Sequence, residues 1–306
     1  MTGVLVRTCA KVNLCLRVLG RRRDGYHEVQ TVIQAISLWD CIGLRSDSGA
    51  RAINLCVPAG GAPGDDTNTC WRAARLIAEQ TGVSAAVAIE LHKSIPAGAG
   101  LGGGSSDAAA TLAGLARLWD VAVEPRQLEN IAVQIGADVP FFLRGGCCLA
   151  RGRGEKLKPL PAVSMWLVVV VPEERVPTAE AYAALRRPVG APSSGRRLSR
   201  PLQRMVAAAR AGDPALVAEA LHNDFEGVEL PGLAAARRAK AALLSAGCLG
   251  ASVSGSGSAA FGIAADLSQA QAIAAALKQQ WPWVQVARTL QPQESMVISS
   301  LEDQTA

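Results

Sequence analysis

The sequence lacks any long hydrophobic run. Its apolar stretches are short, such as residues 166–171, whereas about 18 to 20 apolar residues are needed to span a bilayer. Residues 1–10 contain Arg7 and no apolar segment of the kind that signal peptides carry. These absences argue against a transmembrane or secreted protein. They predict a cytoplasmic protein with no membrane partner.

The cysteines form no C-x-x-C pair. In a chain of 306 residues, scattered cysteines in apolar surroundings are typical of reduced thiols in a packed interior. We therefore expect buried free thiols, and neither a disulfide framework nor a protein-bound metal. The eight cysteines stand at positions 9, 15, 41, 56, 70, 147, 148 and 248.

Charge of one sign is in only slight excess. The chain has 31 basic and 26 acidic residues, a net charge of +5. This balance suits an anionic small-molecule substrate but does not indicate a nucleic-acid partner. Hydrophobic residues make up 49% and charged residues 19%, which excludes a disordered chain. The length of 306 residues predicts two domains, with one large domain as the alternative.

Periodicity gives a coarse arrangement of elements. Alternating residues around 12–18 and 29–38 predict a hairpin, and the proline-rich connector near 159–161 suggests domains at 1–162 and 163–306. We expect an exposed loop at 187–201 and a frayed polar tail after Gln291. Further strands are expected at 87–91, from residue 166 onward, on both sides of the turn 254–258, and at 284–289. Helices are expected at 71–80, 105–119, 125–136, 202–222, 231–246 and 267–280.

A glycine-rich segment between a strand and a helix is the strongest chemical signal. Glycine allows positive φ and a close approach of backbone to ligand, and the following helix N-terminus attracts a phosphate. A merely flexible connector is the weaker interpretation, because ordering so many glycines costs entropy. The segment consists of Pro96, Ala97, Gly98, Ala99, Gly100, Leu101, Gly102, Gly103, Gly104, Ser105 and Ser106.

Two familiar phosphate loops do not fit this segment. The P-loop pattern G-x-x-x-x-G-K-[ST] does not occur. Gly98, Gly100 and Gly103 match G-x-G-x-x-G, and Asp120 lies near the expected distance. However, the preceding strand alternates with polar residues and no second strand precedes Asp120, so a dinucleotide-binding fold is disfavoured.

Residues 96–108 resemble the phosphate loop of the GHMP kinases, in which a Pro is followed by Gly-Leu-Gly and small residues that open a helix. The inserted Gly103 and Gly104 leave open which serine hydroxyl, if either, contacts a metal. The resemblance implies a two-domain α/β fold, with an N-terminal domain like ribosomal protein S5 domain 2 and a C-terminal ferredoxin-like domain. It also implies ATP as phosphate donor, with Mg²⁺ bound through the ATP phosphates.

Further segments of the chain are similar to one branch of this family: 10–14 with 23–28, 136–142 with 152–155, and 254–258. The similarity implies transfer of the ATP γ-phosphate to the 2-hydroxyl of a cytidine-diphosphate-linked methylerythritol, a step of non-mevalonate isoprenoid synthesis. A homoserine or mevalonate kinase is the alternative within the family. A nucleotide- or RNA-binding protein without activity is the alternative outside it. The oligomeric state stays open between monomer and homodimer.

Asp138 and Lys11 are the candidate catalytic residues. From the residues alone, Asp138 is equally a turn or cap residue or an acid kept for chemistry, and Lys11 is by default a surface lysine. The chain has only six lysines against 25 arginines, so Lys11 beside Asn13 is slightly informative. The resemblance makes Asp138 the acid or base, sets Lys11 against it, and assigns Asn13 a hydrogen bond to substrate.

The resemblance also implies the remaining binding residues. Tyr26 and Tyr182, the only tyrosines, would stack on both faces of cytosine, and His27 would select the base. Taken alone, each tyrosine is more often a packing residue. The alternative for His27 is a turn histidine bonded to backbone. Asn68 and Lys93 are weaker candidates for the nucleotide. A second small-residue turn, otherwise a tight hairpin, would approach substrate phosphates with Ser254, Gly255, Ser256 and Gly257.

Overall fold

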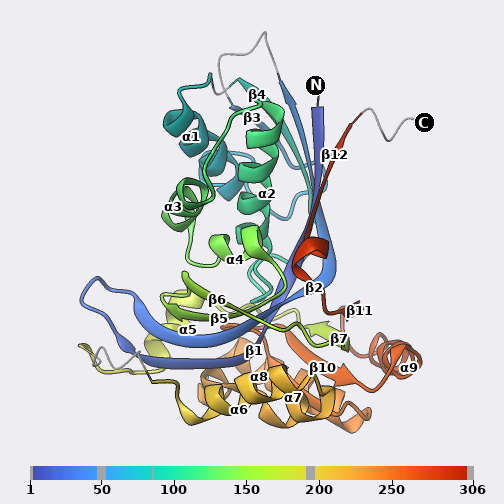
Figure 1. Cartoon of the computed structure of the whole chain (residues 1–306). Coiled ribbons are helices and arrows are strands. Elements are labelled where there is room, and N and C mark those ends of the chain that lie inside the picture. The colour runs from blue at the N-terminus through green and yellow to red at the C-terminus, as the bar shows by residue number, and fades with distance from the viewer. Residues whose placement is uncertain (1–2, 47–52, 85, 191–196, 302–306) are drawn as a thin grey trace.

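The computed structural model describes residues 3–46, 53–84, 86–190 and 197–301. Two β-sheets, each with helices on it, form the molecule (Figure 1). The fold is thus the two-part α/β arrangement that the sequence predicts. Residues 191–196 of the predicted loop lie outside the described residues.

One long hairpin joins the two halves. Strands β1 (Gly3–Arg21) and β2 (His27–Ser46) pair antiparallel over nearly their full lengths and curve through the whole molecule (Figure 1). The pairing register shifts at three places, between Cys9 and Ala10 among them, and such irregularities bend and twist strands. The bent hairpin therefore contributes to both cores.

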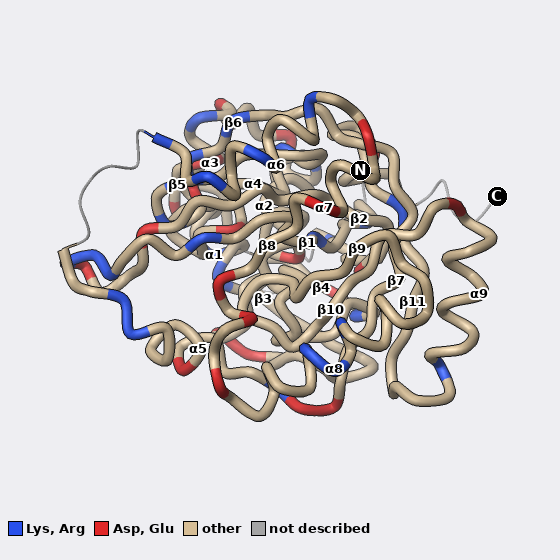
Figure 2. The backbone as a smooth tube through the Cα atoms, turned by 90° about the horizontal axis from the view of Figure 1, so that it is seen from below, with Lys and Arg blue, Asp and Glu red and all other residues tan. Residues whose placement is uncertain are grey.

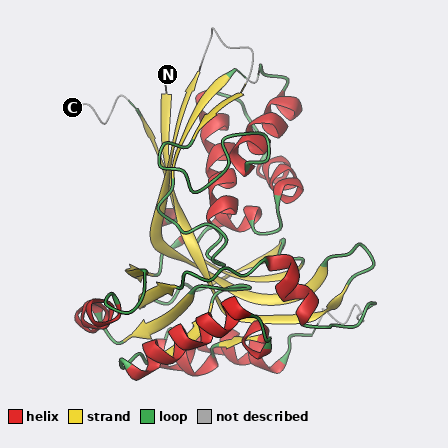
Figure 3. Cartoon of the chain, turned by 180° about the vertical axis from the view of Figure 1, so that it is seen from behind, coloured by secondary structure: helices red, strands yellow, loops and turns green. Residues whose placement is uncertain are grey.

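The first sheet has strand order β12-β1-β2-β4-β3, with β5 and β6 attached to β2 and β8 attached to β1. Helices α1–α4 cover one of its faces, as the view from behind also shows (Figure 3). The remaining strands are β3 (Ile53–Cys56), β4 (Val87–His92), β5 (Cys147–Gly152), β6 (Lys156–Leu160), β8 (His222–Asn223) and β12 (Met296–Ser300), and the helices are α1 (Thr69–Thr81), α2 (Gly103–Leu118), α3 (Pro125–Ile135) and α4 (Val139–Arg144).

The second sheet is antiparallel with order β11-β7-β10-β9. Counted from β7, the strands are ordered 4-1-3-2 with helices in the two crossovers, which is the predicted ferredoxin-like arrangement. Helices α8 and α9 pack on one face, and α6, α7 and the β1–β2 hairpin on the other. These elements are β7 (Trp166–Val171), β9 (Gly250–Val253), β10 (Ala260–Ala264), β11 (Trp283–Arg288), α5 (Thr178–Ala184), α6 (Arg200–Ala211), α7 (Pro214–Ala220), α8 (Pro231–Ser245) and α9 (Leu267–Leu277).

Two expectations about elements are wrong. The helix expected at 202–222 is two helices, since Gly212 at φ 72° ends α6 and the Asp213 side chain caps α7, whose first residue is Pro214. The tail after Gln291 is not frayed over its described part. After a short 3₁₀ turn at Pro292–Glu294, β12 pairs antiparallel with Val4 to Thr8 of β1.

The cysteines are free thiols, as expected, but they are not all buried. Cys56 is exposed and Cys41 is half-buried, while the other six lie in the interior. No helix in the described part of the chain is both long and apolar enough to cross a bilayer.

Candidate active site

The glycine-rich segment links β4 to α2 and lies between the two halves of the molecule. On one side, the Lys11 amide of β1 donates to the Leu101 carbonyl at 2.9 Å. On the other side, the Ala259 amide donates to the Ala99 carbonyl at 2.9 Å. Both sheets therefore hold the loop in place, and its backbone is not free to act as a loose connector.

Glycine is required in this loop because of close packing. Gly100 has φ 83°, and a Cβ built there would lie 2.1 Å from the Ser254 carbonyl oxygen. Gly102 has φ 76°, and a Cβ there would lie 2.7 Å from the ring of Phe142 and 3.0 Å from Lys11 Cγ. The Ser254 hydroxyl donates to the Gly100 carbonyl at 2.9 Å, so the turn at 254–258 packs directly on the loop.

The two serines that open α2 point in different directions. Ser106 is fully buried, and its hydroxyl donates to the Cys9 carbonyl at 2.6 Å. Ser105 is half-buried and lines both cavities described below. Of the two serines, only Ser105 lines these cavities.

Lys11, Asn13 and Asp138 meet beneath this loop. Lys11 Nζ donates to Asn13 Oδ1 at 2.6 Å and lies 3.8 Å from Asp138 Oδ2. Lys11 and Asn13 are only 4% exposed, so the expectation of a surface lysine is wrong. Burial lowers the pKa of the Lys11 ammonium, and the Asp138 charge opposes that effect. Asp138 sits before α4 with its side chain 37% exposed, open to a ligand.

Two adjoining cavities open at this cluster. We call the cavity beneath the loop, of about 320 Å³, the central cleft, and its larger neighbour, of about 890 Å³, the side pocket. Ser105, Asp138, Arg153, Thr178 and Tyr182 line both. The central cleft brings together the predicted residues Lys11, Asn13, Gly98, Gly100, Gly102, Gly103, Gly104, Ser105, Asp138, Tyr182, Gly255 and Ser256.

Aromatic rings line the side pocket. The rings of His27 and Tyr182 lie 4.7 Å apart at 33°, and Tyr182 meets the edge of Phe225. Burial lowers the pKa of His27, helped by the Arg21 charge, so the imidazole is neutral at pH 7 and carries one donor and one acceptor. Tyr26 is 54% exposed with the Arg153 guanidinium 4.6 Å from its ring centre. Figure 2 shows basic residues on the segment that follows α5, at this end of the molecule.

Some predicted residues lie away from these cavities. Asn68 is the N-cap of α1 and accepts from the Cys70 amide. Lys93 Nζ is buried between Asp40 Oδ2 at 2.5 Å and Asp107 Oδ2 at 2.7 Å, against the start of α2. Of the predicted residues, all of them within the described ranges, these line neither cavity: Asn68, Lys93, Pro96, Ala97, Ala99, Leu101, Ser106, Ser254 and Gly257.

Sequence reasoning missed three further contributors. Thr31 accepts from the Asn13 amide at 2.9 Å, which orients that side chain toward Lys11. Thr178 lines both cavities at the start of α5. Arg153 lies in the segment 152–155, which the sequence does single out, but no role follows from that segment alone.

Known proteins share this arrangement. Residues 68–146 match the family model of the GHMP kinases N terminal domain, and residues 205–282 that of the GHMP kinases C terminal domain. The chain is 41% identical over 300 residues to the 4-diphosphocytidyl-2-C-methyl-D-erythritol kinase of Heliobacterium modesticaldum, covering 94% of this chain and 95% of that protein. It is 42% identical to the enzyme of that name from Pelotomaculum thermopropionicum, covering 92% and 96%.

Solved structures agree with these relatives. A crystal structure of 4-(cytidine 5′-diphospho)-2C-methyl-D-erythritol kinase superposes with a TM-score of 0.77 at 36% identity, over 93% of this chain and 98% of that one. A homoserine kinase from Cytophaga hutchinsonii superposes with a TM-score of 0.74 at 22% identity, over 98% of each chain, which supports the fold alone. The chain therefore belongs to the GHMP kinase family, among its 4-diphosphocytidyl-2-C-methyl-D-erythritol kinases.

Proposed function

We propose that the chain transfers the γ-phosphate of ATP to the 2-hydroxyl of 4-(cytidine 5′-diphospho)-2-C-methyl-D-erythritol, in the non-mevalonate route to isoprenoids. One observation carries the proposal. The Lys11–Asp138 pair lies where a glycine-rich loop on one side meets a pocket lined by Tyr26, His27 and Tyr182 on the other. This places a proton acceptor between a phosphate cradle and a site suited to a base.

The loop supplies the site for the donor. Its glycines and Ser105, at the N-terminus of α2, line the central cleft, where backbone N–H groups and a hydroxyl suit the ATP phosphates. In the described residues no three His, Cys, Asp or Glu side chains cluster as metal ligands, so Mg²⁺ would be held mainly through the ATP phosphates. When bound, that ion neutralises phosphate charge.

Asp138 and Lys11 act on the acceptor. Asp138 accepts the proton of the attacking hydroxyl, and its partly exposed carboxylate lines both cavities. Lys11, whose Nζ lies 3.8 Å from Asp138 Oδ2, stabilises negative charge that develops on the acceptor oxygen. Asn13 holds the Lys11 ammonium in place at 2.6 Å and, with Thr31 behind it, stays oriented. Phosphoryl transfer needs mainly such positioning and charge stabilisation.

The side pocket takes the cytidine end of the acceptor. Tyr182 and Tyr26 provide ring faces, and the neutral His27 provides a donor and an acceptor for base selection. The turn at 254–258 borders the central cleft with Gly255 and Ser256, where acceptor phosphates pass.

We propose a division of domains at residue 162, a cytoplasmic location, no nucleic-acid or membrane partner, and action as a monomer or homodimer.

A substrate comparison tests this function. Release of ADP is measured with 4-(cytidine 5′-diphospho)-2-C-methyl-D-erythritol, homoserine or mevalonate as acceptor, each with ATP and Mg²⁺. We expect turnover only with the cytidine compound, and loss of it in Asp138→Asn. Turnover of homoserine or mevalonate in its place would support the alternative within the family. No turnover of any acceptor, with ATP bound normally, would support a binding protein.

A further inference from the structure

The connection between α7 and α8 supports the site without lining either cavity. It contains β8 and a 3₁₀ turn at Asp224–Gly227. Asn223 of β8 donates to the Gly255 carbonyl at 2.8 Å, and so holds the turn that borders the central cleft. The next residue, Asp224, is an acid with a side chain only 6% exposed, and the proposed reaction does not use it. Its partners connect it to the side pocket.

Asp224 binds two arginines and a histidine. Its carboxylate accepts from the Val18 amide at 2.9 Å and lies 3.0 Å from Arg17 Nε, both on β1. It also lies 2.9 Å from His222 Nε2 and accepts from the Arg187 guanidinium at 2.8 Å. Burial by itself would raise the pKa of Asp224, but the hydrogen bonds from His222 and Val18 and the two arginine charges outweigh burial and lower that pKa. Asp224 is therefore an ionised anchor for Arg187.

Of these four partners, only Arg187 lines a cavity of the site. It belongs to residues 185–190, which follow α5 and which we call the edge segment. Arg186, Arg187 and Val189 form part of the wall of the side pocket. The ion pair between Asp224 and Arg187 therefore ties this wall to a buried charge of the second half of the molecule.

The edge segment is also held at its two ends. At the far end, the Arg21 amide donates to the Pro188 carbonyl and the Gly190 amide donates to the Arg21 carbonyl, each at 2.9 Å, beside the hairpin tip (Figure 1). At the near end, Arg186 has φ 49°, a left-handed conformation that is unfavourable for a residue with a side chain. Such a conformation persists only where neighbouring contacts hold it, and the ion pair of Arg187 is such a contact on the next residue.

We infer that Asp224 is a positioning residue for acceptor binding, an assignment that rests on the proposed function. It holds Arg187, and through Arg187 the edge segment, where the side pocket receives the base of the acceptor. If the segment were released, the acceptor would have to order this wall on binding, which costs affinity. Chemistry at Asp138 would continue, because the edge segment does not line the central cleft.

Asp224→Asn tests the inference, because asparagine keeps the shape of the side chain and can still accept from the Val18 amide. We expect the acceptor KM to rise about 5- to 50-fold, with kcat and ATP affinity within about threefold of native. The rise stays below the full effect of a lost charge-assisted contact, because the bonds to Arg21 still hold the far end. Arg17→Met is the matched control. It removes another ion pair of the same carboxylate, on a residue that lines neither cavity, and should leave KM within about threefold.

A double variant shows whether Asp224 acts through Arg187. Arg187→Met should itself raise the acceptor KM, and Asp224→Asn should then add less than about twofold in the Arg187→Met background. Arg187→Met also breaks the same ion pair at its more exposed partner, at 32% against 6%, so it tests the link if Asp224→Asn does not fold.

Hydrogen exchange gives a measure that needs no substrate. The Gly190 amide should exchange at least about tenfold faster in Asp224→Asn and in Arg187→Met, because the edge segment opens more often. Exchange of the amides in β7 should stay native. A general loss of stability would instead speed exchange in β7 as well, so this comparison separates release of the segment from damage to the fold.

Several results would overturn the inference. A native acceptor KM in Asp224→Asn, or native exchange of the Gly190 amide, would mean that Asp224 does not hold the wall. Equal rises of KM in Asp224→Asn and Arg17→Met would mean that Asp224 supports only β1. Fully multiplicative effects in the double variant would mean that Asp224 and Arg187 act independently. Failure of the native chain to turn over the cytidine acceptor would count against the proposed function itself, while the exchange measurement would still test the hold on the segment.

Discussion

Lys11 Nζ lies 3.8 Å from Asp138 Oδ2, and the two side chains differ sharply in exposure, at 5% and 37%. The Lys11 ammonium is the more deeply buried of the two charged groups, and burial lowers its pKa. The carboxylate is the partner that opposes this shift, and it is also the group that a substrate can reach. The pair therefore joins a carboxylate that a substrate can reach to a buried cation.

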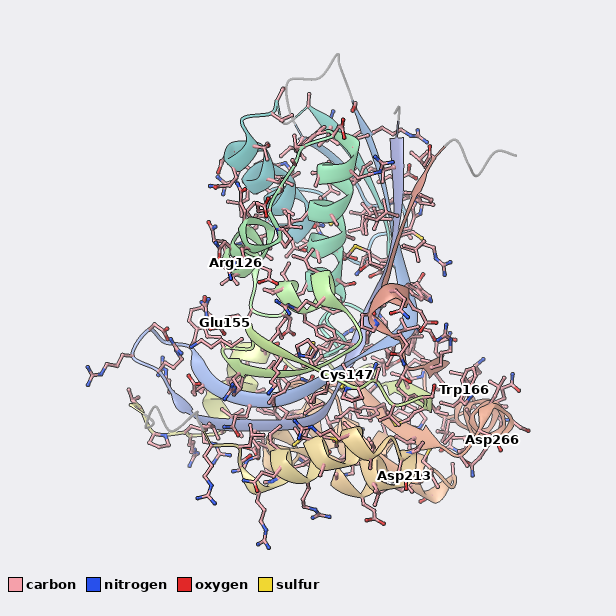
Figure 4. The ribbon with its side chains drawn as sticks, in the orientation of Figure 1. Arg126, Cys147, Glu155, Trp166, Asp213 and Asp266 are labelled. Carbon is pink, nitrogen blue, oxygen red and sulfur yellow. The ribbon has the colours of Figure 1, made fainter. Side chains whose placement is uncertain are left out.

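Replacing Asp138 by Asn tests the proton acceptor. We expect kcat to fall on the order of 10²- to 10⁴-fold, because a positioned base is lost, with ATP affinity nearly unchanged. Steady-state kinetics and ATP titration measure both quantities. Asp213→Asn, which changes an exposed cap of α7 that lines neither cavity, is the control (Figure 4). A near-native kcat in Asp138→Asn would remove Asp138 from the mechanism.

The pH dependence of activity tests Lys11. Its pKa lies below the ordinary 10.5, and the protonated form is the active one, so kcat/KM should fall as pH rises through that lowered pKa. Arginine keeps its charge at such pH, so any residual activity of Lys11→Arg should lack this alkaline limb. The measurement is kcat/KM from pH 6 upward. An alkaline limb of equal midpoint in Lys11→Arg would assign it to another group.

Gly100→Ala tests the packing of the loop against the second sheet. The added Cβ would lie 2.1 Å from the Ser254 carbonyl oxygen, and φ 83° is itself unfavourable for alanine. We expect a loss of ATP affinity of at least tenfold in a folded protein. Gly227→Ala is the control, because Gly227 lines neither cavity and its Cβ would meet no atom within 4 Å. Equal ATP affinity in both variants would contradict a nucleotide-binding role for the loop.

Features encoded over short distances in sequence were predictable. The glycine-rich loop precedes α2 as expected, since glycines and a helix start are local signals. Asn68 caps α1 for the same reason. The break between α6 and α7 also had a local signal: Gly212 ends one helix, Asp213 caps the next, and Pro214 opens its first turn. The long apolar pattern of 202–222 obscured this signal.

Features that depend on distant partners were not predictable. Lys11 alternates as a solvent-facing residue should, yet the loop lies across it and buries it. Residues 296–300 have little strand pattern, and pairing with β1 supplies the backbone hydrogen bonds that order them. Lys93 meets Asp40 and Asp107 only through the fold. The contact between His27 of β2 and Tyr182 of α5, which are far apart in sequence, likewise had no local signal.

The buried ion cluster of Lys93, Asp40 and Asp107 should make stability depend on pH. Burial raises the pKa of Asp107 to about 8, so between its unfolded value near 3.8 and 8 the folded state binds more protons than the unfolded state. Stability from this group therefore falls as pH rises through that window. Urea unfolding at pH 5, 6.5 and 8 should show a smaller decline in Asp107→Asn than in the native chain.

Lys93→Met is the contrasting change in this cluster. It leaves two carboxylates buried without their cation, and breaking such a pair costs about 3 to 5 kcal/mol of unfolding free energy. Asp107→Asn should cost less, because Lys93 and Asp40 still form a pair. If Lys93→Met were as stable as the native chain at pH 8, the cluster would have no structural role.

The side pocket gives the last prediction, because its rings form the proposed site for the base of the acceptor. Stacking of a base on an aromatic ring contributes roughly 1 to 3 kcal/mol by alanine substitution. Tyr182→Ala should therefore raise the KM for the cytidine acceptor about 5- to 150-fold, since about 1.4 kcal/mol is tenfold. Tyr182 is packed against His27 and Phe225, so Tyr182→Phe keeps the ring and separates stacking from damage to the fold.

Tyr26 and His27 should respond differently from Tyr182. Tyr26 is 54% exposed and contacts the Arg153 guanidinium, so Tyr26→Ala should raise the acceptor KM without loss of stability. His27→Ala removes a donor and acceptor and should reduce discrimination between cytidine and uridine analogues. ATP affinity should change little in all three alanine variants, because none of these side chains belongs to the glycine-rich loop that is proposed to bind the ATP phosphates. Kinetics with both substrates varied measures each effect. An unchanged acceptor KM in both tyrosine-to-alanine variants would mean that the base binds elsewhere.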